Sequence, residues 1–196
     1  MLKLTFQSIR QTLVWSVLCG VIYPALITVI CQLCFSHQAN GSLVERDGKV
    51  IGSELLAQQF QGSNYFWPRP SACTYGSSAS GIVASSGSNL GPTSGTLQTN
   101  VQNNAAAFIS GNNLPTNTVV PVDMVFASAS GLDPHISSAA ARLQIARVAA
   151  ARSLPVDQVK ALVEQYVEPP QWGFLGQERV NVLKLNVALD ALKPSK

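Results

Sequence analysis

A single apolar run dominates the amino-terminal part of the chain. Residues 13–35 contain no Asp, Glu, Lys or Arg and are mostly hydrophobic. At ~1.5 Å per residue, a helix over these 23 positions is about 34 Å long, enough to cross a hydrocarbon core of ~30 Å. Trp15 and Phe35 stand near its ends, where interfacial aromatic residues usually lie. The pattern therefore predicts a short arm (residues 1–12), a transmembrane helix (13–35) and a soluble extramembrane domain (36–196).

The rest of the chain shows shorter patterns, some with the spacing of a helix and some with the alternation of a strand. In residues 156–166 the apolar positions fall at i, i+3, i+6, i+7 and i+10, on one face of a helix. Ser137 or Ser138 is placed to cap an Ala-rich helix that ends near Arg152. Because strands and helices interleave without βαβ regularity, we expect one small mixed domain of the α+β class. The other expected elements are strands at 49–51, 119–126 and 179–185, a helical turn or two at 54–60, and helices at 97–108 and 186–192.

Within that domain, residues 70–122 carry no charged side chain. The segment is rich in Gly, Ser and Asn, a composition that is also typical of a disordered linker. Apolar residues such as Leu90, Leu97 and Phe108 recur along it, however, and they can pin a long loop onto a domain. We therefore expect an ordered loop that is partly helical.

Composition and charge exclude several classes of protein. Charged residues make up 12% of the chain, against about 25% in a typical soluble domain, and hydrophobic residues make up 46%. This excludes a charged disordered tail and a coiled coil. The net charge of +3 is spread thinly, so no basic stripe indicates binding to nucleic acid. Cys31 and Cys34 lie inside the apolar run, so neither a zinc site nor a disulfide framework is expected.

A cleaved signal peptide is the main alternative to a membrane anchor, since Lys3 and Arg10 precede the apolar run. The run is longer than the apolar region of a usual signal peptide, and the candidate cleavage site after Ala39 has the bulky His37 at the −3 position. We therefore expect an uncleaved single-span anchor. Arg10 adjoins the span, whereas Arg46 is the first cation after it, which favours an amino terminus inside the cell and the domain outside.

Gly20, Tyr23 and Pro24 interrupt the apolar run. A proline leaves one helix carbonyl without its usual donor, and neighbouring helices often compensate for this in membranes. Small residues such as Gly20 also favour contact between helices. We expect this part of the helix to pack within a complex, while a tolerated kink in a simple anchor is the alternative.

Few residues are candidates for chemistry. His135 follows Asp133 and Pro134 in an expected turn, and no nucleophile with an orienting acid is recognisable around it. Neither a Walker-type phosphate loop nor an H-E-x-x-H metal motif is present. The glycine turn formed by Ser86, Gly87, Ser88 and Asn89 is a weak candidate for binding a phosphate through backbone amides. The sequence thus indicates no catalytic residue and no metal site.

Several segments, taken in order, resemble the C subunit of the Kdp-type potassium-transporting ATPase of bacteria. The resemblance covers nearly the whole chain, and the combination of Arg69-Pro70-Ser71-Ala72 with Ala129-Ser130-Gly131-Leu132-Asp133 is specific. The chain departs from the family pattern in two places. It reads Ser-Ser-Gly-Ser-Asn at 85–89, where the family tends to have a second glycine, and residues 98–113 lack the basic residues that the family tends to carry there.

The resemblance implies a small single-span subunit of a complex that imports potassium at the expense of ATP. Its partners would be a channel-like A subunit, a P-type B subunit that hydrolyses ATP, the small F subunit and membrane lipid. The chain would be a non-catalytic accessory subunit with no cofactor of its own, and it would act as a catalytic chaperone that raises the affinity of the B subunit for ATP. Candidates for contact with other subunits are Gly20, Tyr23, Pro24, Arg69 and Asp133.

Two alternatives remain beside this interpretation. The chain can be a nucleotide-binding regulator that uses the loop Ser86–Asn89, or an anchored enzyme built on Asp133 and His135. A location in the bacterial inner membrane, with the amino terminus cytoplasmic and the domain periplasmic, would keep the domain away from cytoplasmic ATP. That topology favours a structural role.

Overall fold

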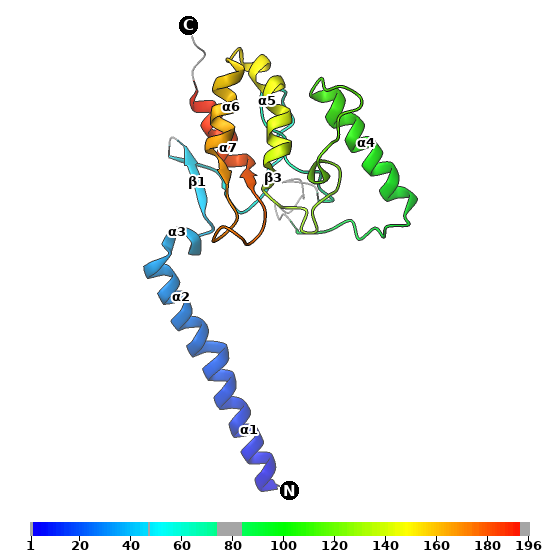
Figure 1. The fold of residues 1–196 in the computed structure, drawn as a ribbon. Coiled ribbons are helices and arrows are strands. Elements are labelled where there is room, and N and C mark those ends of the chain that lie inside the picture. The colour runs from blue at the N-terminus through cyan, green and yellow to red at the C-terminus, as the bar shows by residue number, and fades with distance from the viewer. Residues whose placement is uncertain (1, 47, 74–83, 193–196) are drawn as a thin grey trace. The chain divides into compact units, whose positions relative to one another are not determined.

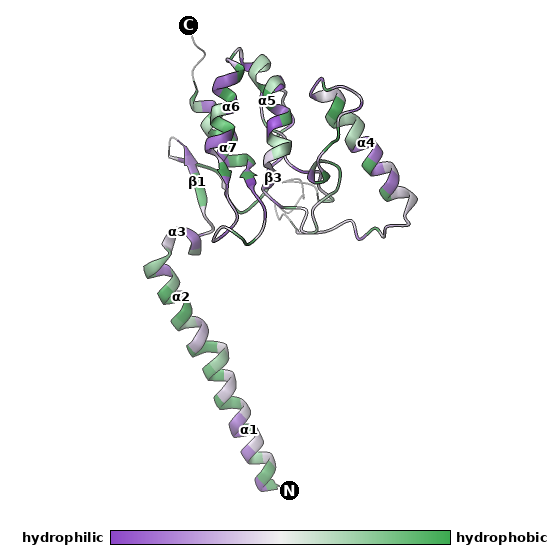
Figure 2. Ribbon diagram, viewed as in Figure 1, coloured by the Kyte–Doolittle hydropathy of each residue, from purple (hydrophilic) through white to green (hydrophobic). Residues whose placement is uncertain are grey.

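The computed structural model describes residues 2–46, 48–73 and 84–192, and the chain divides into two compact units, residues 1–51 and 52–196. The first unit begins with three consecutive helical segments: α1 (Leu2–Val17), the π-helical turn η1 (Leu18–Ile22) and α2 (Tyr23–Cys34). Together they form a 33-residue helix that is long and apolar enough to cross a membrane. Figure 2 shows hydrophobic residues along most of its length. The helix includes the residues expected to form a short arm, and the position of the membrane boundary at residue 13 stays a prediction.

A short helix, α3 (Ser36–Ala39), and a two-stranded sheet follow, and the second strand of the sheet crosses the division between the units. The sheet pairs β1 (Leu43–Arg46) with β2 (Lys49–Ser53), and β2 includes the strand expected at 49–51.

The second unit combines a three-stranded antiparallel sheet with helices, which confirms the α+β class. The strand order is β3 (His135–Ser137), β5 (Arg179–Asn181) and β4 (Val167–Glu168), and Ile136 pairs with Val180. Helix α5 (Ser138–Arg152) packs against α6 (Val156–Gln165), which in turn contacts α7 (Val182–Ala191). Figure 1 shows these three helices grouped together, with α4 (Gly95–Gly111) on the other side of α5.

The core of this unit lies between the three helices and the sheet. Its fully buried side chains are mainly small or branched, which lets α5 and α6 approach closely. Nearly half of its buried residues come from the periodic positions of α5 and α6. Members of the core with at most 2% exposure include Phe66, Ile136, Ala140, Val148, Val159, Val163, Val180, Leu185 and Leu189.

The helices at 138–152 and 156–165 confirm the sequence expectation, and the caps explain where they begin. The Ser137 hydroxyl accepts a hydrogen bond from the Ala140 amide (3.1 Å), so Ser137 caps α5. Helix α4 confirms the helix expected inside the uncharged segment, and Ser94 caps it. Residues 74–83 of that segment lie outside the described residues.

Two other expected elements are wrong, and a third, the strand at 179–185, is confirmed only over 179–181. Residues 54–60 form no helix, because Ser53 bonds the amides of Leu55 and Leu56 in a turn and the Ala57 amide donates to Leu132. The expected strand at 119–126 is replaced by a 3₁₀ turn, η2 (Val122–Met124). The expected strand at 179–185 ends at Asn181, whose side chain accepts from the Lys184 amide (3.1 Å) and so starts α7 four residues early.

Candidate functional site

The structure brings together the two motifs that carry the family resemblance. The Arg69 guanidinium lies 2.6 Å from Asp133 Oδ2, and the Ser71 hydroxyl donates to the Gly131 carbonyl (2.6 Å). Gly131 has a φ of +68°, and a Cβ there would collide with Cys73 and with the Ser86 carbonyl. Only glycine fits this backbone and this close approach. The two segments are therefore joined by an ion pair and a tight turn.

Asp133 is the centre of a small polar cluster. Its Oδ1 accepts from the His135 amide (3.0 Å) and lies 3.3 Å from His135 Nδ1. Burial raises the pKa of Asp133, but the hydrogen bonds from His135 and Arg69 and the charge of Arg69 outweigh it and lower the pKa to about 2. Asp133 is thus a permanent anion at neutral pH, which suits a structural ion pair better than a proton-transfer role.

A cavity next to this cluster is lined by Arg69, Asp123, Asp133, His135 and Ser137, among others. The Ser137 hydroxyl donates to Asp123 (3.0 Å) and at the same time caps α5, so its proton is not directed at His135. The described residues contain no group of three or more His, Cys, Asp or Glu that could hold a metal ion. In this arrangement the polar side chains orient the backbone around β3.

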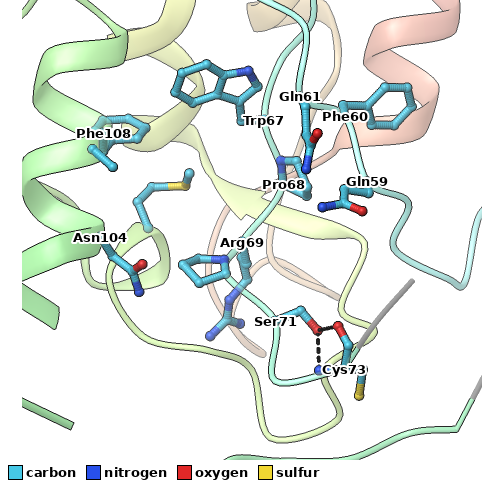
Figure 3. A pocket seen from close by; sticks show the side chains of 13 residues that line it. Gln59, Phe60, Gln61, Trp67, Pro68, Arg69, Ser71, Cys73, Asn104 and Phe108 are labelled. Atoms are coloured by element: carbon cyan, nitrogen blue, oxygen red, sulfur yellow. Dashed lines mark hydrogen bonds between the residues drawn. The ribbon is translucent and has the colours of Figure 1, made fainter. Parts of the chain in front are cut away.

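A second cavity, of about 370 Å³, also has Arg69 in its lining. Figure 3 shows Trp67 and Phe108 near one end of it and Ser71 and Cys73 near the other. The Arg69 Nε, by contrast with the paired Nη1, is buried and has no hydrogen-bond partner among the described residues. The lining mixes aromatic and amide side chains and contains no acid.

The loop proposed for phosphate binding uses its backbone internally. The Ser86 amide donates to Ser130 O (3.1 Å) and to Cys73 Sγ (3.0 Å), and the Ser85 hydroxyl also donates to Ser130 O (2.8 Å). A Cβ on Gly87 would meet the Ala129 carbonyl, so this glycine serves a close approach between two loops. Ser86, Gly87, Ser88 and Asn89 line neither of the two cavities described above. Nucleotide binding by this loop stays a prediction.

The sequence did not reveal a buried polar network around the aromatic segment 65–67. The side-chain amide of Asn186 bonds both the amide and the carbonyl of Phe66 (2.8 and 3.0 Å). Gln144 does the same for Trp67 (2.7 and 3.4 Å). The two side-chain amides pair with the backbone of Phe66 and Trp67 as a neighbouring strand would. This pairing holds the start of the Arg-Pro-Ser-Ala motif in place.

Arg147 connects the rest of this network. Its guanidinium donates to the carbonyls of Ser63 and Tyr65 (2.5 and 2.9 Å) and to the side chains of Asn112 and Gln144 (2.8 Å each). It also lies over the ring of Trp67, 4.0 Å from the centroid. Arg147 is 6% exposed. Its position seven residues after the buried Ala140 and three after Gln144 is the signal that could have placed it on the inner face of α5.

In the first unit, Gly20 lies within the π-helical turn, and Tyr23 and Pro24 begin α2. The Tyr23 amide donates to Leu18 O, and Thr28 donates to the Pro24 carbonyl (2.8 Å). Apart from its chain neighbours and the backbone of its own helix, no described atom lies within 4 Å of the place where a Cβ on Gly20 would be. The turn therefore presents a flat backbone surface beside Tyr23.

The chain was compared with known proteins. The family model described as K+-transporting ATPase, c chain, matches residues 5–191. A protein of Methylococcus capsulatus named potassium-transporting ATPase KdpC subunit is 54% identical over 187 residues, 95% of this chain and 96% of the relative. Proteins with the same name from Mycobacterium tuberculosis and Nitratidesulfovibrio vulgaris are 49% and 51% identical, over 94% and 98% of this chain and 96% of each relative.

This match extends from the apolar helix to the end of α7, and it includes both motifs that the Arg69–Asp133 pair joins. The apolar helix over Leu2–Cys34, the one candidate span among the described residues, is consistent with a single-pass membrane subunit of a transport complex. The chain belongs to the family of the c chain of the K+-transporting ATPase.

Proposed function

We propose that the chain is a non-catalytic accessory subunit of a high-affinity, ATP-driven potassium importer. It spans the bacterial inner membrane once, with its amino terminus in the cytoplasm and residues 36–196 in the periplasm. It stabilises the assembly of the channel-like A subunit and the P-type B subunit, together with the F subunit, and ATP hydrolysis takes place in another subunit. One observation carries this proposal: Arg69 pairs with Asp133, and Ser71 donates to the Gly131 carbonyl. The polar groups of both family motifs thus stabilise the fold.

The influence on ATP is indirect in this proposal. A periplasmic domain has no access to cytoplasmic ATP, so the chain raises the affinity of the B subunit for ATP by stabilising the assembled conformation. The internal hydrogen bonds of Ser86 and the close packing of Gly87 support this, because the Ser86 amide is already paired and Gly87 lies against the Ala129 carbonyl.

The full-length chain alone should therefore not bind ATP. In detergent micelles, about 1 mM ATP is expected to leave its thermal unfolding midpoint unchanged, because only a ligand that binds the folded state raises stability. A rise of several degrees that the variant Ser88→Ala/Asn89→Ala abolishes would support the nucleotide-binding regulator instead.

The membrane helix supplies the contact with other subunits. No residue of α1, η1 or α2 is buried, and Gly20 leaves a surface without a side chain at the π-helical turn. Small residues at such positions let two helix backbones approach closely in lipid. We place the contact with another subunit at Gly20, Tyr23 and Pro24.

Replacing Gly20 by Leu tests this contact. The larger side chain should keep a neighbouring helix away, and the amount of A and B subunits that co-purify with the tagged chain should fall by about tenfold. Gly20→Ala is the matched control, since it also removes the glycine but keeps the surface small. Both side chains fit the helix itself, because no described side chain lies within 4 Å of the position that a Cβ would take at Gly20 and its φ is not in the left-handed region. Equal recovery of the complex with both variants would contradict the proposed contact.

A further inference from the structure

An apolar tip lies between β4 and β5, in residues 169–176. Trp172 and Phe174 are 78% and 74% exposed, and Leu175 is 45% exposed. The sequence of the tip, Pro-Pro-Gln-Trp-Gly-Phe-Leu-Gly, contains no charged residue. Tryptophan and phenylalanine side chains are seldom so exposed unless they bind something.

The tip has a defined conformation. The amides of Gln171 and Leu175 each donate to the carbonyl of the other (2.9 Å), and the Gly173 amide donates to Pro170 O (2.9 Å). Trp172 has a φ of +55°, a left-handed conformation that costs a non-glycine residue about 1 kcal/mol or more. The tip therefore keeps a strained backbone at Trp172 in a conformation that leaves both aromatic side chains exposed.

The size of the tip fits a lipid surface better than a protein. Two aromatic side chains and a leucine offer about 400–500 Å² for burial, whereas a specific protein interface usually needs about 800 Å² on each partner. The interface of a bilayer, in contrast, accepts single Trp and Phe side chains. Because the tip carries no charge, entering the headgroup region requires no charged group to be desolvated.

The chain's own anchor makes weak binding sufficient. Only 17 residues connect the end of α2 with Gly52, so the second unit stays within about 60 Å of the membrane even if this connection is fully extended. Tethering at this range gives a high effective concentration of lipid surface, and a few apolar side chains can then bind it.

We propose that residues 169–176 insert Trp172, Phe174 and Leu175 into the interfacial region of the bilayer as a second, shallow membrane contact. This contact holds the domain in one orientation on the membrane surface. The proposal relies on the membrane anchor, and it does not depend on which subunits the chain assembles with.

Fluorescence quenching of the full chain in vesicles tests the proposal. The vesicles contain phosphatidylethanolamine and phosphatidylglycerol, with or without lipids that carry a doxyl quencher near the headgroup. The spectrum of the variant Trp172→Phe is subtracted from that of the natural chain, which removes the emission of Trp15 and Trp67. We expect the remaining Trp172 emission to fall about twofold with the doxyl lipid and to resist aqueous iodide.

A matched control moves the tryptophan to another exposed position. Val119 is 88% exposed, so in Trp172→Phe/Val119→Trp the new side chain should be quenched by iodide and not by the lipid. Quenching of Trp172 by iodide alone would overturn the proposal. So would protection of Trp172 from both quenchers in vesicles that hold the assembled complex, since a partner subunit would then cover the tip. Co-purification of the complex tests the proposed contact at Gly20 and is a separate measurement. A negative result in one experiment therefore does not decide the other proposal.

Discussion

Replacing Arg147 by Met is expected to lower the free energy of unfolding by about 3–5 kcal/mol. Methionine keeps most of the length of the side chain but donates no hydrogen bond. The carbonyls of Ser63 and Tyr65 and the side-chain oxygen of Asn112 would then lose a buried donor. The stacking on Trp67 would also be lost.

One effect opposes this loss. Burial lowers the pKa of Arg147 to about 10, so the charge is held in the fold at some cost, although the side chain is still protonated at neutral pH. Methionine removes that cost. The loss is expected to dominate, because breaking a buried charged network leaves its partners unpaired, whereas replacing the entire network would not.

Chemical denaturation of the full chain in micelles measures the change. Arg147→Lys separates charge from geometry: a lysine ammonium cannot reach acceptors that the planar guanidinium contacts on several sides, so this variant should also be clearly destabilised. Arg142→Met is the matched control on the same helix, because Arg142 is exposed and its partners, Glu164 and the Ser138 hydroxyl, are not buried. It should be much less destabilised. An Arg147→Met variant as stable as this control would show that the network contributes little.

The helices of the domain were predictable because their signals are local. The apolar spacing of residues 156–166 and the capping serine at 137 are read within a few turns, and α6 and α5 confirm them. The expected elements that are wrong depend on distant groups. The Ala57 amide bonds Leu132, and Asp123 accepts from the Ser137 amide, so the conformations of 54–60 and 122–124 are set by β3 and its neighbours.

The candidate site shows the same division between local signals and contacts with distant residues. The resemblance singled out Arg69 and Asp133, but their pairing across 64 positions is a property of the folded chain. Arg147 is one of three arginines on α5, and its contacts with Ser63, Tyr65 and Asn112 are known only from the folded chain. The exposed tip at Trp172 gave no periodic signal, because it is a turn with two prolines and two glycines.

Replacing Asp133 by Asn is expected to lower the free energy of unfolding by about 2 kcal/mol near neutral pH. The pKa of Asp133 falls from an ordinary 3.8 to about 2 in the folded chain, and each unit corresponds to about 1.4 kcal/mol. The amide keeps the shape of the carboxylate but loses its charge, so it leaves Arg69 without its counter-ion and weakens the bond with His135.

The pH dependence distinguishes this effect from a general loss of packing. Because the folded chain binds the Asp133 proton less tightly than the unfolded chain, the carboxylate contributes its full stability above about pH 5 and loses it as the pH falls through about 2. The difference between the natural chain and Asp133→Asn should therefore shrink between about pH 4 and pH 2, as followed by urea denaturation in micelles. Asp157→Asn, at an exposed position in the first turn of α6, removes the same charge and should give a small difference at every pH. A difference for Asp133→Asn that stays constant down to pH 2 would mean that the shape of the side chain, and not its ion pair with Arg69, joins the two motifs.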